Sequence, residues 1–258
     1  MSIARIHPRL IARVILPVLL LAAHSHAQTP LTTSDLTANG SAVITASSNG
    51  NPILWLTPAS QGQAGTVFTT SSIQFDSAYT FRTFFQFKMT DAGYYGASDG
   101  MTFTLQTESA NAVGTSGGSL GYAGITPSVA VEFDTWQNSF DINDNHIAVL
   151  VNGVMNDLDP QTPYGVTDCQ PSTGVFGCMS NGDVWSVWID YDGTDLYVAL
   201  ADNSSIRPKN LLRFPLVIAT VLGGNSAFIG FTAGTGSGYE NHYVANWAFS
   251  PSRRSTNP

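Results

Sequence analysis

The stretch AVEFDTWQNSFDINDNHIAVLV, residues 130–151, joins an apolar strand pattern to a dense group of polar side chains. Glu132 and Asp134 are two residues apart, so their side chains project from the same face of a strand. Trp136 and Asn138 join that face if the strand continues as far. Carboxylates crowded at one place stay ionised only beside a cation; otherwise some of them take up protons. The pattern therefore indicates one or two divalent cations at a strand end and in the loop that follows.

The residue types in this stretch also indicate which cations fit. Aspartate, asparagine and backbone carbonyl oxygens suit calcium, and an added histidine suits a transition metal such as manganese. Asp141 and His146 follow in the same stretch and supply these groups. A second interpretation remains open, in which EFDT is a solvated strand face and DINDN is a polar turn bonded to its own backbone. The apolar residues 129–131 and Phe133 favour burial and hence the metal site.

The composition of the chain indicates a single domain built from strands. It has 258 residues, of which only 11% are charged, and Gly, Ser, Thr and Asn are abundant. Such a composition is typical of strands and turns rather than helices, and the length suits one large all-β domain. The 18 acidic and 10 basic residues leave a formal charge of −8. An acidic surface disfavours nucleic acids and anionic membranes as partners.

Residues 1–27 have the pattern of a secretory signal peptide. Basic residues come first, an apolar run follows at residues 14–23, and the segment ends at the small residue Ala27. The run has about ten residues, which is too short for a helix that spans a membrane. We expect cleavage after Ala27 and a secreted or periplasmic mature protein without membrane insertion. The basic residues are Arg5, Arg9 and Arg13.

The rest of the chain is predicted to form one domain at residues 28–250 and a disordered C-terminal tail at residues 251–258. Its two cysteines are Cys169 and Cys178. An exported protein permits a disulfide bond, and the residues between the two cysteines are rich in turn formers. Because no histidine lies near the pair, a zinc site is disfavoured and a disulfide between them is expected.

The strands are predicted from the alternation of apolar and polar residues. In residues 80–88, Phe81 and Phe87 share one face with other apolar residues, which predicts a half-buried antiparallel strand. The apolar residues 211–221 are expected to form a strand region. Residues 28–39 are a weak segment with no clear element.

VEFDTWQN followed by DINDNHI resembles the metal-binding segment of the legume-type (L-type) lectins. Three further motifs occur in the order that this family has them: SDG at residues 98–100, GGSLG at residues 117–121, and AFIGFTAGTGSGYENHYVANWAF at residues 227–249. The chain is similar to a secreted bacterial member of the family over about residues 36–250. The resemblance implies an all-β, concanavalin-A-like jelly-roll sandwich of two antiparallel sheets.

The resemblance implies two metal sites that share their aspartates. The ligands that it implies for a transition metal, usually manganese, are Glu132, Asp134, Asp141 and His146. Those that it implies for calcium are Asp134, Asn138, Asp141 and the backbone oxygen of Trp136. The chain departs from the family in a shorter stretch between Asn138 and Asp141, and in Ala148 and Leu150, which stand where the family has Gly and Asp.

The resemblance also implies a carbohydrate site beside the metals. Asp99 corresponds to the main sugar-binding carboxylate and follows the Ser98–Asp99 peptide bond, which is often cis in the family. Gly118 corresponds to a backbone N–H donor, Asn138 to a side-chain donor, and Trp136 to a flat face for sugar C–H groups. The role implied for the metals is to hold this site in shape without touching the sugar.

One loop of the family sets sugar specificity, and it corresponds to residues 234–241 here. It is short, which implies an open pocket. The candidates for ligand contacts in it are Ser237, Gly238 and Tyr239.

The sequence therefore predicts a non-catalytic lectin that binds glycans, with calcium and manganese, or another divalent transition metal, as cofactors. Two other functions remain open: a structural or adhesion module on the same fold with weak or no sugar binding, and a glycoside hydrolase of the laminarinase type. Such hydrolases carry E-x-D-x-x-E on one strand, which Glu132 and Asp134 match, but Gln137 replaces the acid/base carboxylate. A homodimer is a further expectation, since relatives often pair through their back sheets.

Overall fold

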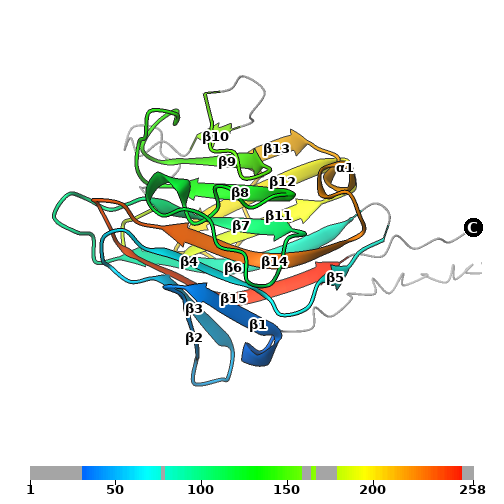
Figure 1. The fold of residues 1–258 in the computed structure, drawn as a ribbon, viewed down its shortest axis with the longest axis horizontal. Helices are drawn as coiled ribbons and strands as arrows, with labels where there is room; N and C mark the ends of the chain where they lie inside the picture. Colours follow the sequence, from blue (N-terminus) through cyan, green and yellow to red (C-terminus); the bar gives the residue numbers. More distant parts are fainter. Residues whose placement is uncertain (1–30, 77–78, 159–163, 167–178, 252–258) are drawn as a thin grey trace, which may run out of the picture.

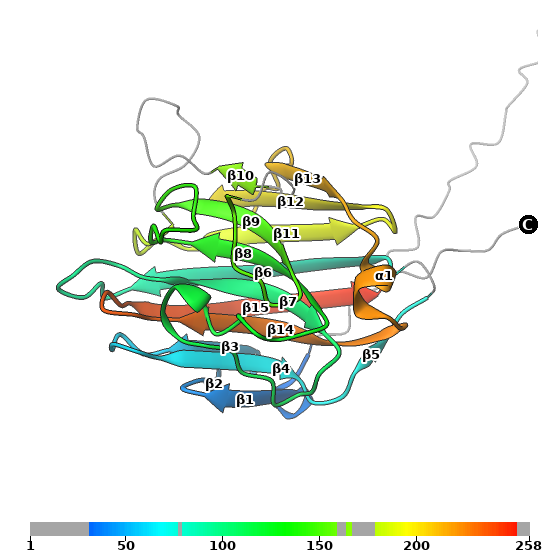
Figure 2. The same ribbon diagram turned by 45° about the horizontal axis from the view of Figure 1, so that its top comes forward.

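The chain folds into two antiparallel sheets that face each other across an apolar core (Figures 1 and 2). The structure is a computed structural model, and it describes residues 31–76, 79–158, 164–166 and 179–251. In each sheet, some consecutive strands pair with each other, but the central strands pair with strands from distant parts of the chain: β14 (Ser226–Gly234) and β15 (Asn241–Pro251) each lie between two strands that come much earlier in the sequence. This arrangement agrees with the two-sheet sandwich predicted from the sequence.

The first sheet, called the front sheet below, carries the strands that surround the predicted site. In order across the sheet, its strands are β1 (Leu36–Gly40), β4 (Ala64–Thr69), β14 (Ser226–Gly234), β7 (Gly100–Gln106), β8 (Ser128–Asp134), β9 (His146–Val151) and β10 (Tyr164–Val166). The short strand β5 (Ile73–Gln74) pairs with β14 at one end.

The second sheet, called the back sheet, supplies the other wall of the core. Its strands, in order, are β13 (Leu212–Pro215), β12 (Asp195–Asp202), β11 (Trp185–Tyr191), β6 (Phe81–Thr90), β15 (Asn241–Pro251), β3 (Pro52–Thr57) and β2 (Val43–Ala46). The helical elements are η1 (Thr33–Asp35), η2 (Gly117–Ser119) and α1 (Ile218–Leu222). Within the described ranges, no helix reaches the length and hydropathy that a bilayer span requires.

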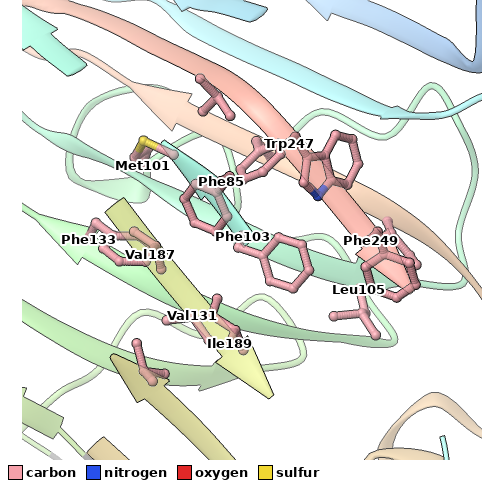
Figure 3. Packing of buried hydrophobic residues seen from close by; sticks show 14 of the residues in the cluster. Phe85, Met101, Phe103, Leu105, Val131, Phe133, Val187, Ile189, Trp247 and Phe249 are labelled. Atoms are coloured by element: carbon pink, nitrogen blue, oxygen red, sulfur yellow. The ribbon is translucent and has the colours of Figure 1, made fainter. Parts of the chain in front are cut away.

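Aromatic side chains dominate the space between the sheets, and Figure 3 shows them in contact. Strand β6 alternates as predicted: Phe81, Phe85 and Phe87 are buried, Arg82 and Lys88 are exposed, and Phe84 on the second face is half-buried. The ring centroids of Phe85 and Phe231 lie 4.8 Å apart, and those of Phe231 and Trp247 lie 4.9 Å apart. Burial of each such side chain contributes roughly 1.5–3 kcal/mol to the stability of the fold, so this core holds the two sheets together.

One sequence prediction about local structure was wrong, and another was confirmed only in part. Residues 28–39, expected to be weak, contain most of β1, which lies at the edge of the front sheet and pairs with β4. In residues 211–221, β13 ends at Pro215, because proline lacks the N–H that continues a ladder. The apolar residues beyond it form the short helix α1, which ends at Gly223 with a φ of 68°.

The outer face of the front sheet is covered by the long connection between β7 and β8, residues 107–127 (Figure 2). Beneath this connection, buried threonines of the sheet form hydrogen bonds with each other: the Oγ1 atoms of Thr102 and Thr232 lie 2.8 Å apart. Thr232 Oγ1 also donates to the carbonyl oxygen of Leu120 at 2.7 Å. These bonds fix the turn η2 and its glycines over the ends of β7 and β14.

Candidate functional site

The candidate site lies where one end of β7, β8 and β9 meets the loops that leave them. In the antiparallel ladders, Asp134 pairs with Gly100 of β7 on one side and with His146 of β9 on the other. Glu132 pairs with Ala148, whose small side chain stands beside the carboxylate. The pairing therefore brings residues from three separate motifs to one edge of the front sheet.

The four residues predicted to bind a transition metal lie together. We call Glu132, Asp134, Asp141 and His146 the acidic cluster. All are buried; the exposed fraction is 4% for Asp141 and 0% for the other three. Donor atoms of Asp134, Asp141 and His146 lie within 4.8 Å of one another, and His146 Nε2 lies 3.7 Å from Glu132 Oε2. The chain thus has a possible acidic and histidine metal site.

Burial makes the negative charges of the acidic cluster costly. It raises the pKa of Glu132 to about 7 and the pKa of Asp141 to about 6, and it raises the pKa of Asp134 well above the usual range. Repulsion between neighbouring carboxylates acts in the same direction. Protons or cations must therefore offset this charge in the folded protein.

The imidazole of His146 is held on both of its nitrogens. Nδ1 lies 3.1 Å from the carbonyl oxygen of Asn143, and Nε2 contacts Asp157 Oδ2. Burial alone would lower the pKa of His146, but the hydrogen bonds to Asp157 and Glu132 raise it to about 11. Because a carbonyl oxygen only accepts, Nδ1 carries a proton, and the lone pair of the neutral ring lies on Nε2.

Unpaired oxygens in the acidic cluster test whether a cation fits there. In the described part of the chain, several buried oxygens have no hydrogen-bond partner: Glu132 Oε1 and Oε2, Asp134 Oδ2, Asp141 Oδ1 and Asn138 Oδ1. An unpaired buried carboxylate oxygen costs several kcal/mol by order of magnitude. Carboxylate and amide oxygens with one imidazole nitrogen are a donor set for calcium and a transition metal. The residues present therefore fit these ions.

The loop after β8 brings Asn138 to the acidic cluster by a different route from the one predicted. Strand β8 ends at Asp134, so Trp136 and Asn138 are not on its face as a continued strand would place them. Instead, the Trp136 N–H donates to Asp134 Oδ1 at 2.8 Å, and the Asn138 N–H donates to Asp141. The Asp141 N–H in turn donates to the Asn138 carbonyl at 3.2 Å. A turn closed by its own carboxylates replaces the extended strand.

Asp99 lies next to the acidic cluster. The Ser98–Asp99 peptide bond is cis, as the sequence predicted. The Asp99 carbonyl oxygen accepts a bond from Thr135 N at 2.9 Å, and its N–H donates to the Gly234 carbonyl at 3.0 Å. The side chain is 3% exposed, and burial raises its pKa to about 6. Asp99 Oδ2 has no partner within the described residues, so this acceptor is free for a ligand.

Gly118 lies against Asn138, which joins the glycine turn to the loop after β8. A Cβ added at Gly118 would overlap the Asn138 side-chain amide, so only glycine fits there. The Gly117 N–H donates to Thr235 O at 3.0 Å, and the Cα of Gly236 lies close enough to Asp99 that an added Cβ would meet Oδ2 at 3.1 Å. Asp99, Gly118 and Asn138, called the pocket below, are thus brought together.

The candidate specificity loop borders this pocket. Ser237 is exposed, and its carbonyl oxygen accepts a bond from Gln61 Nε2 at 2.9 Å. Gly238 is buried against Ser98, since a Cβ there would lie 2.7 Å from Ser98 Oγ. The Tyr239 N–H donates to Gly96 O at 3.1 Å. Trp136 reaches the same rim, because a Cβ at Gly96 would lie 3.2 Å from its indole ring.

Two buried acidic residues at the site were not predicted. Asp157 contacts His146, and Glu240 Oε1 lies 3.0 Å from Thr135 Oγ1, behind the backbone of Asp99. His242 Nε2 lies 3.6 Å from Glu240 Oε1. No local pattern marks either acid, because each is an isolated carboxyl in an irregular stretch whose partners come from other strands.

Several other predictions fall on residues that the structure does not describe. These are the signal peptide at residues 1–27, the cysteines Cys169 and Cys178, and most of the tail at residues 251–258. The pairing of the cysteines stays a prediction.

The geometry also bears on the hydrolase alternative. Glu132, which a laminarinase-type enzyme would need as its nucleophile, is fully buried against His146. Gln137, at the position of the missing acid, lies exposed on the loop beyond the strand. A glycosidic bond cannot reach Glu132 in this arrangement.

Comparisons with known proteins give one family. A family model described as the legume lectin domain matches residues 27–258. Two similar curated proteins come from Arabidopsis thaliana. The L-type lectin-domain containing receptor kinase VIII.1 is 32% identical over 213 residues, which is 80% of this chain and 27% of the relative. Receptor kinase I.7 is 33% identical over 219 residues, which is 79% of this chain and 32% of the relative. The chain thus spans about a third of their length.

Solved structures show the same fold. The basic winged bean lectin with Tn-antigen is 26% identical, with a TM-score of 0.66 over 86% of this chain and 94% of that chain. The winged bean acidic lectin complexed with methyl-alpha-D-galactose is also 26% identical, with a TM-score of 0.65 over 83% and 91% of the two chains. The metal-free form of lectin I-B4 from Griffonia simplicifolia matches at 22% identity with a TM-score of 0.63, over 84% of this chain and 93% of that one.

Proposed function

The chain belongs to the legume lectin family, and from this premise we propose that it is a non-catalytic lectin whose sugar site is preorganised by calcium and a transition metal. The observation that supports this function best is the meeting of three motifs at one place. Asp99 has an unpaired buried oxygen, and Gly118 lies against Asn138 beside the acidic cluster. A ligand that offers several hydroxyl groups matches an acceptor and two donors arranged in this way.

Each residue of the pocket has a separate role in the proposed recognition. Asp99 Oδ2 accepts from sugar hydroxyls, and a charged acceptor makes these bonds stronger than neutral ones. The N–H of Gly118 and the amide nitrogen of Asn138 donate to sugar oxygens. The indole ring of Trp136, at the rim, offers an apolar face for sugar C–H groups. Ser237 and Gly238 of the specificity loop supply further contacts.

The metal ligands follow the chemistry of the donor groups. Calcium is held by Asp134, Asn138, Asp141 and the backbone oxygen of Trp136. The transition metal, manganese or a similar ion, is held by Glu132, Asp134, Asp141 and His146. When bound, these ions supply positive charge that keeps the carboxylates ionised and the loop rigid. The side-chain oxygen of Asn138 then faces calcium, which leaves its amide nitrogen directed at the sugar.

The proposed partners are glycans, and two relatives suggest where to begin. Winged bean lectins were solved with Tn-antigen and with methyl-alpha-D-galactose. Galactose-type glycans are therefore the first ligands to test here. We further propose export of the chain, since residues 1–27 have the pattern of a signal peptide. Pairing into a homodimer through the back sheet is a separate proposal, which sedimentation of the purified protein checks.

Metal removal tests the proposed function. The purified protein is treated with a chelator and applied to a glycan array, with and without added calcium and manganese. We expect glycan binding to be lost on chelation and restored by the ions, since the loop that holds Asn138 loses its charge balance. A protein that binds the array equally well after chelation has no metal-dependent site. One that binds no glycan in any condition is better described as a structural module on this fold.

A further inference from the structure

Asp157 belongs to neither of the ligand sets described above, but it lies directly against the acidic cluster. It follows β9 by six residues, in the irregular segment 152–158. Its side chain is 2% exposed, and Oδ2 contacts His146 Nε2. Donor atoms of Glu132, His146 and Asp157 all lie within 4.8 Å of one another. His146 also belongs to a second group of three, which it forms with Asp134 and Asp141.

The backbone holds Asp157 in this position from two sides. The N–H groups of Asp157 and Leu158 both donate to the carbonyl oxygen of Phe140, at 3.0 and 3.3 Å. Phe140 directly precedes Asp141, so the segment is tied to the loop that carries a metal ligand. Further back, Met155 packs on the apolar group that covers the outer face of β8 and β9. Asp157 is therefore fixed by hydrogen bonds to the loop that carries Asp141.

The remaining oxygens of this trio have no partner. Asp157 Oδ1 and both carboxylate oxygens of Glu132 are buried and unpaired among the residues that the structure describes. The hydrogen bond from His146 reaches only one oxygen of Asp157. The other carboxylate oxygens of the trio have neither a protein partner nor contact with solvent. When these buried carboxylates are ionised, a cation among them offsets their charge. In the neutral ring of His146, Nε2 carries a lone pair in place of the proton of this hydrogen bond, so the nitrogen that contacts Asp157 can instead bind a cation.

We propose that Asp157 is a fifth protein ligand of the transition metal, beside Glu132, Asp134, Asp141 and His146. It takes a coordination position that a water molecule would otherwise hold. This inference rests on the proposed function, since it presumes that a transition metal binds at the acidic cluster. With Asp157, the chain would supply five protein ligands to the ion instead of four, and the ion would be more completely enclosed.

Charge and donor type agree with this assignment. With Asp157, the site holds four carboxylates, whose negative charges equal the positive charges of two divalent cations. Without Asp157, the acidic cluster itself holds only three carboxylates, and Asp99 beside it would have to balance the fourth positive charge. Four carboxylates and one imidazole also exceed the four ligands of a tetrahedral zinc site. The ion expected here is therefore a six-coordinate one such as Mn²⁺.

Manganese titration of the purified protein tests the proposal. The chelator-treated wild type is compared with Asp157→Asn and Asp157→Ala, at saturating calcium. Free Mn²⁺ is measured by its electron paramagnetic resonance signal, and the relaxation rate of water protons reports the water molecules bound to the ion. We expect the affinity for Mn²⁺ to fall about 10- to 100-fold or more in both variants. We also expect water relaxation per bound ion to rise in Asp157→Ala, because a water molecule enters the vacated position.

A matched control comes from the same region. Asp144 is exposed on the loop between Asp141 and His146, so Asp144→Asn removes one negative charge near the site without removing a buried oxygen. It should bind Mn²⁺ as the wild type does, which separates direct coordination from distant charge effects. The calcium-dependent melting temperature of each variant shows whether the fold is intact.

The possible results separate this proposal from the function on which it rests. If the wild type binds Mn²⁺ and the Asp157 variants match it in affinity and relaxation, Asp157 is no ligand, although the metal site stands. A weaker affinity with unchanged relaxation makes Asp157 a hydrogen-bond partner that orients His146, which also overturns the proposal. A wild type that binds no Mn²⁺ removes both the metal site and the fifth ligand.

Discussion

Asp99 carries the clearest conflict between folding and function at the scale of single residues. Its carboxylate is almost fully buried, its Oδ2 has no partner in the described chain, and burial raises its pKa to about 6. The folded protein gains nothing from ionising such a group. Binding gains much, because a charged acceptor bonds strongly to hydroxyl groups.

Replacing Asp99 by asparagine should separate these two effects. We expect Asp99→Asn to lower glycan affinity by roughly one to two orders of magnitude, since a hydrogen bond to a charged group is worth about 1.5–3 kcal/mol. The melting temperature near neutral pH should stay the same or rise, because a buried unpaired charge is removed. Isothermal titration with a glycan found on the array and thermal denaturation measure the two quantities.

Glu108, exposed just beyond the other end of β7, offers the control for this experiment. Glu108→Gln changes the charge by the same amount and should alter neither quantity. A loss of melting temperature in Asp99→Asn together with the loss of affinity would mean that Asp99 has a structural role instead.

At the scale of elements, the contact between the turn η2 and the loop after β8 determines how the candidate site is assembled. The turn η2 lies over the front sheet because Thr232 of β14 bonds to Leu120, and the loop after β8 is closed by Asn138 and Asp141. The contact between these loops is Gly118 against the side chain of Asn138. A residue of the proposed calcium site and a residue of the sugar site therefore share one boundary.

A methyl group at this boundary should disturb both sites at once. We expect Gly118→Ala to weaken calcium binding and glycan binding together, because the added Cβ displaces Asn138. Overpacking of this kind costs about 1–3 kcal/mol, so each affinity should fall about 5- to 150-fold. Calcium titration followed by melting temperature, and glycan titration, give the two affinities.

Gly224 provides the matched substitution, since its added Cβ would meet nothing within 4 Å and its φ is not positive. Gly224→Ala should leave both affinities unchanged. If Gly118→Ala weakens glycan binding but not calcium binding, Asn138 does not connect the two sites.

The whole molecule combines a stable apolar sandwich with a strongly charged interior edge. The pKa values of Asp99, Asp141 and Glu132 are raised to about 6, about 6 and about 7, from ordinary values of 3.8, 3.8 and 4.5. The folded state thus holds more protons than the unfolded chain across this range, so protons stabilise it there. In the proposed function, cations bound to the same oxygens would take over this role when the protons leave.

The stability of the chelated protein should therefore depend on pH. We expect its free energy of unfolding to be highest below the ordinary pKa values and to fall as the pH rises through about 6 and about 7. Calcium and manganese should remove this fall, and their own affinity should rise over the same range. Thermal denaturation at a series of pH values, with and without the ions, measures both effects. A chelated protein that becomes more stable with rising pH would contradict the raised pKa values.

The amino-acid sequence by itself determined the parts of this protein that depend on neighbours along the chain. Alternation in residues 80–88 predicted β6, because side chains on a strand face opposite sides. The spacing of Glu132 and Asp134 predicted a shared face, and the ladder places both in the acidic cluster. The Asp99 motif, through its resemblance to a family, predicted the cis bond. Local strand geometry fixes the first two features, whereas the cis bond was implied by the resemblance alone.

Only the tertiary structure decided which distant residues complete the site. Asp157 and Glu240 reach it through two irregular segments with no local signal, and their partners lie elsewhere in the chain. Gly118 meets Asn138 because the core and the threonines under η2 set the distance between two loops. Burial, which raises the pKa of the carboxyls, also arises only when both sheets and their covering loops assemble. Contacts between residues far apart in the chain leave no periodic pattern in the sequence, so they cannot be predicted from it before the fold is known.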